Sequence, residues 1–96
     1  MNKTIVNRYG IMGQIDITIE ECSELVRACI KYRRSMGFGY KTPLVQSETK
    51  AEIIKEIAHV SNAIESLKLL FGVSDEEIEK LVQESDTKCL KMLEDE

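Results

Sequence analysis

Two groups of acidic residues have the composition and spacing of a metal-binding site. The first is the stretch EECSE, which contains Glu20, Glu21 and Glu24. The second is EIAH, which begins at Glu56 and ends at His59, the only histidine in the chain. Carboxylate oxygens are the ligands that Mg²⁺ and Mn²⁺ prefer in proteins. The sequence therefore predicts a site for one of these ions if the fold brings the two groups together.

Helical periodicity places some of these acids among apolar residues. Residues 14–35 carry apolar side chains at helical spacing, and a second helix begins shortly after residue 49 with the same pattern. Advancing about 100° per residue puts Glu21 inside the apolar arc of the first helix and Glu56 inside that of the second. Because an unpaired buried carboxylate is costly, both positions favour a metal or another cation as partner.

The neighbouring candidates lie nearer the edges of these arcs. Glu24 is at the border of the first arc and His59 is near the border of the second, whereas Glu20 points to the polar side. Two alternatives to a metal site remain open. Glu21 follows Thr18 by three residues, which is also the spacing of a capping box. Glu56 could instead pair with an arginine, and the candidates are Arg8, Arg27, Arg33 and Arg34.

The rest of the chain predicts further helix and no strand. Thr49 and Glu52 have capping-box spacing and would open the second helix, which Gly72 would end. Ser74 and Glu77 form another capping box before a third helix. A short helix or turn precedes Gly10, and residues 35–47 form a loop. We predict an all-α chain, one domain over residues 1–96, built as a helical bundle of three main helices.

Composition narrows the classes of function. The chain has 96 residues and a net charge of −4, so it lacks the basic footprint of a protein that binds a nucleic acid polymer. No apolar run reaches the length of a membrane span, and no signal peptide is visible. The three cysteines, Cys22, Cys29 and Cys89, are predicted to be small buried thiols, which suits a cytoplasmic location.

The two acidic motifs together resemble those of the MazG-like family of all-α nucleoside triphosphate pyrophosphohydrolases. That family carries E-E-x-x-E on one helix and E-x-x-D on the next. The stretches YGIMGQIDITIEE and LKLLFGVSDEEIEKL are also similar to small, stand-alone members. The resemblance covers roughly residues 9–93. It implies a bundle completed by oligomerisation, as a homodimer or homotetramer. It also implies hydrolysis of a nucleoside triphosphate, often a deoxy or modified one, to the monophosphate and pyrophosphate with Mg²⁺.

The resemblance also assigns roles to individual residues. Glu21, Glu24 and Glu56 would be metal ligands, and Glu20 and Glu21 are the candidates for the catalytic step. His59 stands where the family motif has its aspartate, and imidazole favours Mn²⁺ or other transition metals over Mg²⁺. Three alternatives follow: an active enzyme with an altered metal set, a nucleotide-binding sensor or sponge without turnover, or a structural bundle that binds a partner.

The residues that would recognise the nucleotide are predicted less specifically than the acidic residues. Gln14, Asn62 and Tyr40 are the candidates for binding the substrate base or sugar, with Phe38 as a further stacking candidate. The candidates for contact with the phosphates are Lys41, Lys50, Arg33 and Arg34.

Overall fold

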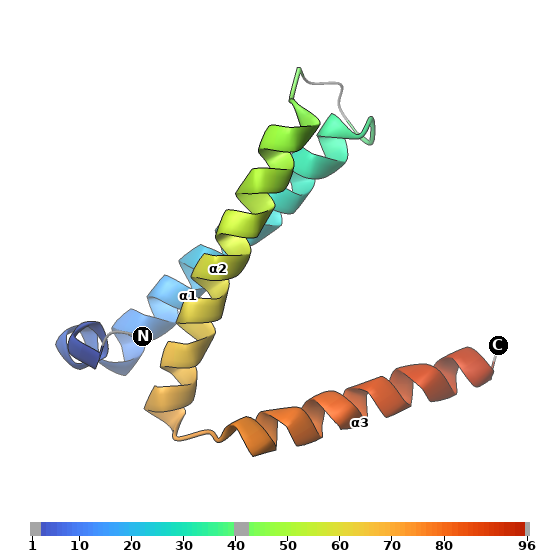
Figure 1. Ribbon diagram of the computed structural model, residues 1–96. Coiled ribbons are helices and arrows are strands. Elements are labelled where there is room, and N and C mark those ends of the chain that lie inside the picture. Colours follow the sequence, from blue (N-terminus) through green and yellow to red (C-terminus); the bar gives the residue numbers. More distant parts are fainter. Residues whose placement is uncertain (1–2, 40–42, 96) are drawn as a thin grey trace.

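The computed structural model describes residues 3–39 and 43–95, with side chains described from residue 10 onward. This part of the chain folds into three helices, α1 (Lys3–Ser35), α2 (Gln46–Phe71) and α3 (Asp75–Glu94), and contains no strand. Helices α1 and α2 lie side by side and antiparallel, while α3 extends away from them (Figure 1). The all-α prediction with three main helices is confirmed.

Gly10 divides α1 into a short first segment and a long second one. Its φ of 67° and ψ of −172° lie outside the helical region, so the chain bends there. A positive φ of this kind is readily adopted only by glycine. The short helix expected before Gly10 is therefore present, and the long segment that follows carries the first acidic motif.

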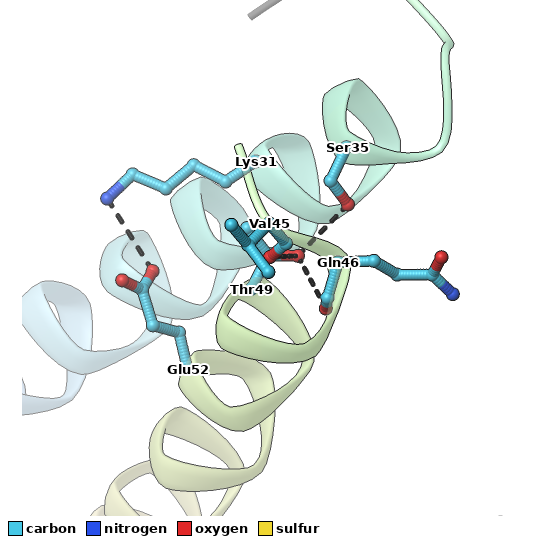
Figure 2. A network of polar contacts seen from close by, with 6 residues as sticks. All are labelled: Lys31, Ser35, Val45, Gln46, Thr49 and Glu52. Atoms are coloured by element: carbon cyan, nitrogen blue, oxygen red, sulfur yellow. Dashed lines mark hydrogen bonds and ion pairs between the residues drawn. The ribbon is translucent and has the colours of Figure 1, made fainter. Parts of the chain in front are cut away.

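Helix α2 begins earlier than its capping-box pattern predicted. Val45 is the N-cap residue, without a side-chain cap, and Thr49 lies inside the helix. The Thr49 hydroxyl lies 3.0 Å from the Gln46 carbonyl and 3.0 Å from the hydroxyl of Ser35, the last residue of α1 (Figure 2). The expected Thr49 cap was wrong because this buried hydroxyl joins the loop ends of the two helices instead.

Local signals do set the junction between α2 and α3. Gly72 adopts a left-handed conformation (φ 62°) that ends α2, as predicted. The Ser74 hydroxyl accepts a hydrogen bond of 3.1 Å from the backbone N–H of Glu77, which confirms the second predicted cap. The Lys68 ammonium forms ion pairs with Glu65 and with Asp75 of the first turn of α3. These hydrogen bonds raise the pKa of Lys68, with Asp75 contributing most.

Small and polar side chains fill the contact between α1 and α2. The buried hydrophobic residues of the described side chains are Ala28 and Ala63, and the buried polar ones are Gln14, Thr49 and Ser66. Short side chains allow two helices to approach closely, because interaxial distance depends on the residues at the contact. The hairpin thus brings facing residues near one another but encloses little apolar volume.

Much apolar surface remains exposed in the single chain. Helix α3 does not pack on α1 or α2 within the described residues. The radius of gyration is 17.2 Å, against about 12–13 Å for a compact chain of this length. The accessible surface is 7751 Å², against about 5,600 Å² for a compact monomer of this mass. The excess, roughly 2,000 Å², is comparable to the area of a permanent protein interface.

The cysteines correct one prediction. Cys22, Cys29 and Cys89 are free and exposed rather than buried. Cys22 lines an open apolar groove of about 380 Å³ together with Ile19 and Val26 of α1 and Leu67 of α2. The apolar arc of α1 is broader than the stripe that one neighbouring helix covers, so its remaining part faces outward.

None of the helices in the described part of the chain is both long enough and apolar enough to span a membrane.

Candidate metal centre between the two long helices

The antiparallel hairpin brings the two predicted acidic motifs together. Glu21 and Glu24 come from successive turns of α1, and Glu56 and His59 from successive turns of α2. Each offers one ligand atom, and these four atoms all lie within 4.8 Å of one another. We call these four residues the acidic cluster. They are the four residues that the sequence predicts as metal ligands.

The imidazole of His59 lies between two of the carboxylates. Its Nδ1 is 3.4 Å from Glu21 Oε2 and 3.5 Å from Glu56 Oε2. The side chains of Glu21 and Glu56 are 24% and 12% exposed, whereas that of His59 is 42% exposed. The histidine therefore closes the solvent side of a site whose acids are set deeper between the helices.

Two oxygens of the acidic cluster lack the partners that buried polar atoms need. Glu21 Oε2 and Glu56 Oε2 are buried without a hydrogen-bond partner. Leaving a charged acceptor unsatisfied in this way costs free energy, and a bound cation removes that cost. The oxygens also belong to the hard ligand type that suits Mg²⁺ or Mn²⁺. The donor set therefore fits such an ion.

The pKa of the Glu24 carboxyl is raised by burial and by its position among the other acids of the cluster. Its pKa is raised above the ordinary value of 4.5, first by burial and then by the charges of Glu21 and Glu56. A hydrogen bond with Glu56 and the charge of Glu20 raise it further. In the absence of a cation, a proton is therefore held at Glu24 more readily than at a free carboxyl.

Glu20 lies outside the acidic cluster, as the helical projection predicted. Its side chain is exposed, but its charge reaches Glu24. Glu21 is not part of a capping box, because α1 runs on through that position and the Thr18 hydroxyl donates to the Gln14 carbonyl at 2.9 Å. His59 Nδ1 lies 3.5 Å from the Glu56 carboxylate. No ion pair among the described residues joins Glu56 to Arg27 or Arg33, and the side chain of Arg8 lies outside the described residues.

A small pocket of about 190 Å³ adjoins the acidic cluster on one side. It is lined by Gln14, Ile17, Glu21, His59, Asn62 and Ala63. The predicted substrate-binding residues Gln14 and Asn62 thus lie in one pocket, next to the acidic cluster. Tyr40 and Lys41 lie outside the described residues, and Phe38 is exposed in the loop after α1.

Thr18 fixes the orientation of the Gln14 amide. The one hydroxyl proton of Thr18 goes to the Gln14 carbonyl, so its oxygen faces Gln14 Nε2 as an acceptor, at 3.5 Å. Gln14 Oε1 is then left buried without a partner, on a side chain that is 1% exposed. The pocket therefore presents a fixed acceptor, which a ligand N–H group would satisfy. Only the position of Thr18 one turn after Gln14 signals this in the sequence.

A second groove, of about 280 Å³, adjoins the acidic cluster on its other side. It contains Glu24 and Glu56 together with Arg27, Lys31 and Lys55. Sequence reasoning missed these three cations as a group, although Arg27 and Lys31 follow Glu24 at helical spacing. The predicted phosphate contacts Arg33 and Lys50 are exposed and are not among the residues lining this groove.

Two bacterial proteins are similar to this chain over most of its length. A UPF0102 protein of Acetivibrio thermocellus is 30% identical over 89 residues, which cover 90% of this chain and 68% of that protein. The uncharacterized protein YvdC of Bacillus subtilis is 32% identical over 80 residues, covering 83% and 76%. The chain belongs to the same family as these two proteins. Neither name states an activity. No protein-family model matches the chain, and no solved structure matches it.

Proposed function

We propose that the protein is a metal-dependent nucleoside triphosphate pyrophosphohydrolase, which converts a nucleoside triphosphate to the monophosphate and pyrophosphate. The main support is the convergence of Glu21, Glu24, Glu56 and His59, with two buried carboxylate oxygens that lack partners. The resemblance of the two acidic motifs to those of MazG-like enzymes supplies the reaction.

Each side chain of the site has a task in this proposal. The three glutamates and His59 would hold Mg²⁺ or Mn²⁺ at the contact of α1 and α2. When bound, such an ion supplies positive charge against the phosphate oxygens and activates water as a nucleophile. Glu20 is exposed next to the acidic cluster, and its carboxylate can accept the proton that the water loses. Gln14 and Asn62 would bind the base or sugar.

The proposal includes assembly into a homodimer or homotetramer. The described side chains bury two alanines as their hydrophobic core, and α3 packs on neither of the other helices. A bundle completed by further copies of the chain would cover the exposed apolar faces of α1 and α3.

The test is product analysis with a panel of ribo- and deoxyribonucleoside triphosphates in the presence of Mg²⁺ or Mn²⁺. We expect equal amounts of monophosphate and pyrophosphate from at least one nucleotide. Glu56→Gln should abolish the reaction, whereas Glu65→Gln, at an exposed acid of the same helix, should preserve it. Absence of product with every nucleotide and both metals would refute the enzymatic proposal.

A second candidate function is nucleotide binding without turnover, as in a sensor or sponge. It is favoured by His59, which puts a neutral or positively charged group where the related motif has a carboxylate, 3.4–3.5 Å from two glutamates. Tight nucleotide binding without any product would support this function over hydrolysis.

A further inference from the structure

The acidic cluster lies between two recesses of opposite character. On one side is the small pocket with the buried amide acceptor of Gln14, and on the other is the groove with Arg27, Lys31 and Lys55. Glu21 lines the first recess, and Glu24 and Glu56 line the second. A ligand with a polar ring at one end and an anionic tail at the other would therefore bind in a single direction.

The cations follow the groove away from the acidic cluster. Arg27 comes three residues after Glu24 and Lys31 seven, which corresponds to about 4.5 Å and 10.5 Å along the axis of α1. Lys55 faces them from α2, directly before Glu56. Positively charged side chains thus continue from the acidic cluster toward the loop end of the hairpin. The successive phosphates of a triphosphate would require such an arrangement.

These cations can exchange their present contacts for a ligand. Lys31 pairs with Glu52 at 3.6 Å, and both side chains are about half exposed (Figure 2). Exposed ion pairs of this kind contribute little and are readily replaced. Arg27 and Lys55 line the groove without an ion pair among those found in the described part of the chain.

We infer that the groove lined by Arg27, Lys31 and Lys55 binds the β- and γ-phosphates of the triphosphate, so that the base lies toward Gln14 and the leaving pyrophosphate toward the loop end of α1. This inference rests on the proposed function, because it presumes a nucleotide at the acidic cluster. It assigns to Arg27 and Lys55 the phosphate contacts that sequence reasoning gave to Lys41, Lys50, Arg33 and Arg34.

The experiment measures binding of inorganic tripolyphosphate in the presence of Mn²⁺, by calorimetry on the full chain. Arg27→Gln and Lys55→Gln should each weaken this binding about tenfold, and the double variant more strongly. Lys50→Gln, an exposed cation of α2 that does not line the groove, is the control and should bind as the parent does.

A second readout separates phosphate binding from a structural role. Mn²⁺ alone should bind to both variants as tightly as to the parent, or more tightly, because a positive charge beside the ligands is removed. Unchanged tripolyphosphate binding in the double variant would overturn the inference, and so would an equal loss of Mn²⁺ and tripolyphosphate binding. Selective loss without any hydrolysis by the parent would keep the groove assignment while rejecting the proposed reaction.

Discussion

At the scale of single residues, the notable feature is a shortage of positive charge. Glu21 and Glu56 each bury an oxygen without a hydrogen-bond partner, and His59 is the basic group closest to both. A cation would satisfy both oxygens and would favour the ionised form of Glu24, whose pKa is raised in its absence. The chemistry expected here is therefore sensitive to pH and to the charge at position 59.

The raised pKa of Glu24 gives the first prediction. Because burial and the neighbouring carboxylates favour its protonated form in the folded protein, Glu24 stabilises the metal-free fold at low pH. That contribution is lost as pH rises through the raised pKa. Mn²⁺ binds the ionised carboxylate, so the stabilisation by Mn²⁺ should increase with pH, whereas the contribution of Glu24 to the metal-free fold decreases. The stabilisation by Mn²⁺ should therefore be weaker at about pH 5 than at about pH 7. Thermal unfolding with and without Mn²⁺ measures both trends. If the metal-free stability of a Glu24→Gln variant changed with pH as steeply as that of the parent, the pH dependence could not be assigned to Glu24.

The histidine gives the second prediction. His59→Asp adds a hard anionic oxygen ligand to the acidic cluster, so we expect Mg²⁺ to bind about tenfold more tightly. Asn62→Asp adds the same charge one turn further along α2, beside the small pocket, and is the matched control. Calorimetric titration with Mg²⁺ distinguishes the two variants. Equal gains in both would mean that charge alone acts, and that His59 does not occupy a ligand position.

At the scale of elements, α3 packs on neither α1 nor α2 within the described residues, so in a single copy of the chain its stability depends on its own sequence. Its first turn carries Asp75, Glu76 and Glu77 and is capped by Ser74. Ser74→Ala should remove about 1 kcal/mol of local helix stability and lower the helical signal in circular dichroism. Thr87→Ala is the control, since that hydroxyl donates only to the Gln83 carbonyl within α3. Both variants are measured at low protein concentration, where contacts with another copy are weakest. Full helicity of Ser74→Ala under that condition would contradict the stabilising role of the cap.

The helices and their ends also show how much of the fold could be predicted from the sequence. Helical periodicity placed Glu21 and Glu56 in the contact between helices, and Gly72 and Ser74 marked the α2–α3 junction correctly, because each of these signals is local. The Thr49 cap failed because its hydroxyl is used across the hairpin, with Ser35. Periodicity alone could not predict which side chains face one another, since the register depends on the loop between α1 and α2.

The exposure of a side chain depends on how much of its helix a neighbouring helix covers, which the periodicity of one helix does not show. Cys22 and Cys29 lie on the apolar arc of α1 and were expected to be buried, yet both are exposed because α2 covers only one side of that arc. Cys89 is exposed on α3, which packs on neither α1 nor α2 within the described residues. The buried amide oxygen of Gln14 without a partner, and the groove lined by Arg27, Lys31 and Lys55, could be recognised only once the register of the two helices was known. The residues of the acidic cluster could therefore be predicted from the sequence, whereas the pocket and the groove beside the cluster could not.

At the scale of the whole molecule, the exposed apolar stripe of α3 predicts self-association. Leu81 on this stripe is 61% exposed. Leu81→Glu would place a charge in the proposed interface and should weaken association at least about tenfold. Gln83→Glu introduces the same charge toward the polar side of α3 and should leave the oligomer intact. Sedimentation of the two variants and the parent checks this. A parent that is monomeric at all concentrations would contradict the expected assembly.

The central claim is that α1 and α2 together form a divalent-cation site, and binding of Mn²⁺ without nucleotide tests it most directly. Calorimetry and thermal unfolding should be compared for the parent, Glu56→Gln and Glu65→Gln. At about 100 times its Kd, Mn²⁺ should stabilise the parent and Glu65→Gln by about 2.7 kcal/mol. Glu56→Gln should lose most of this stabilisation, although its metal-free form should be no less stable, because one crowded charge is gone. Equal Mn²⁺ binding by Glu56→Gln and the parent, or none by either, would contradict the claim.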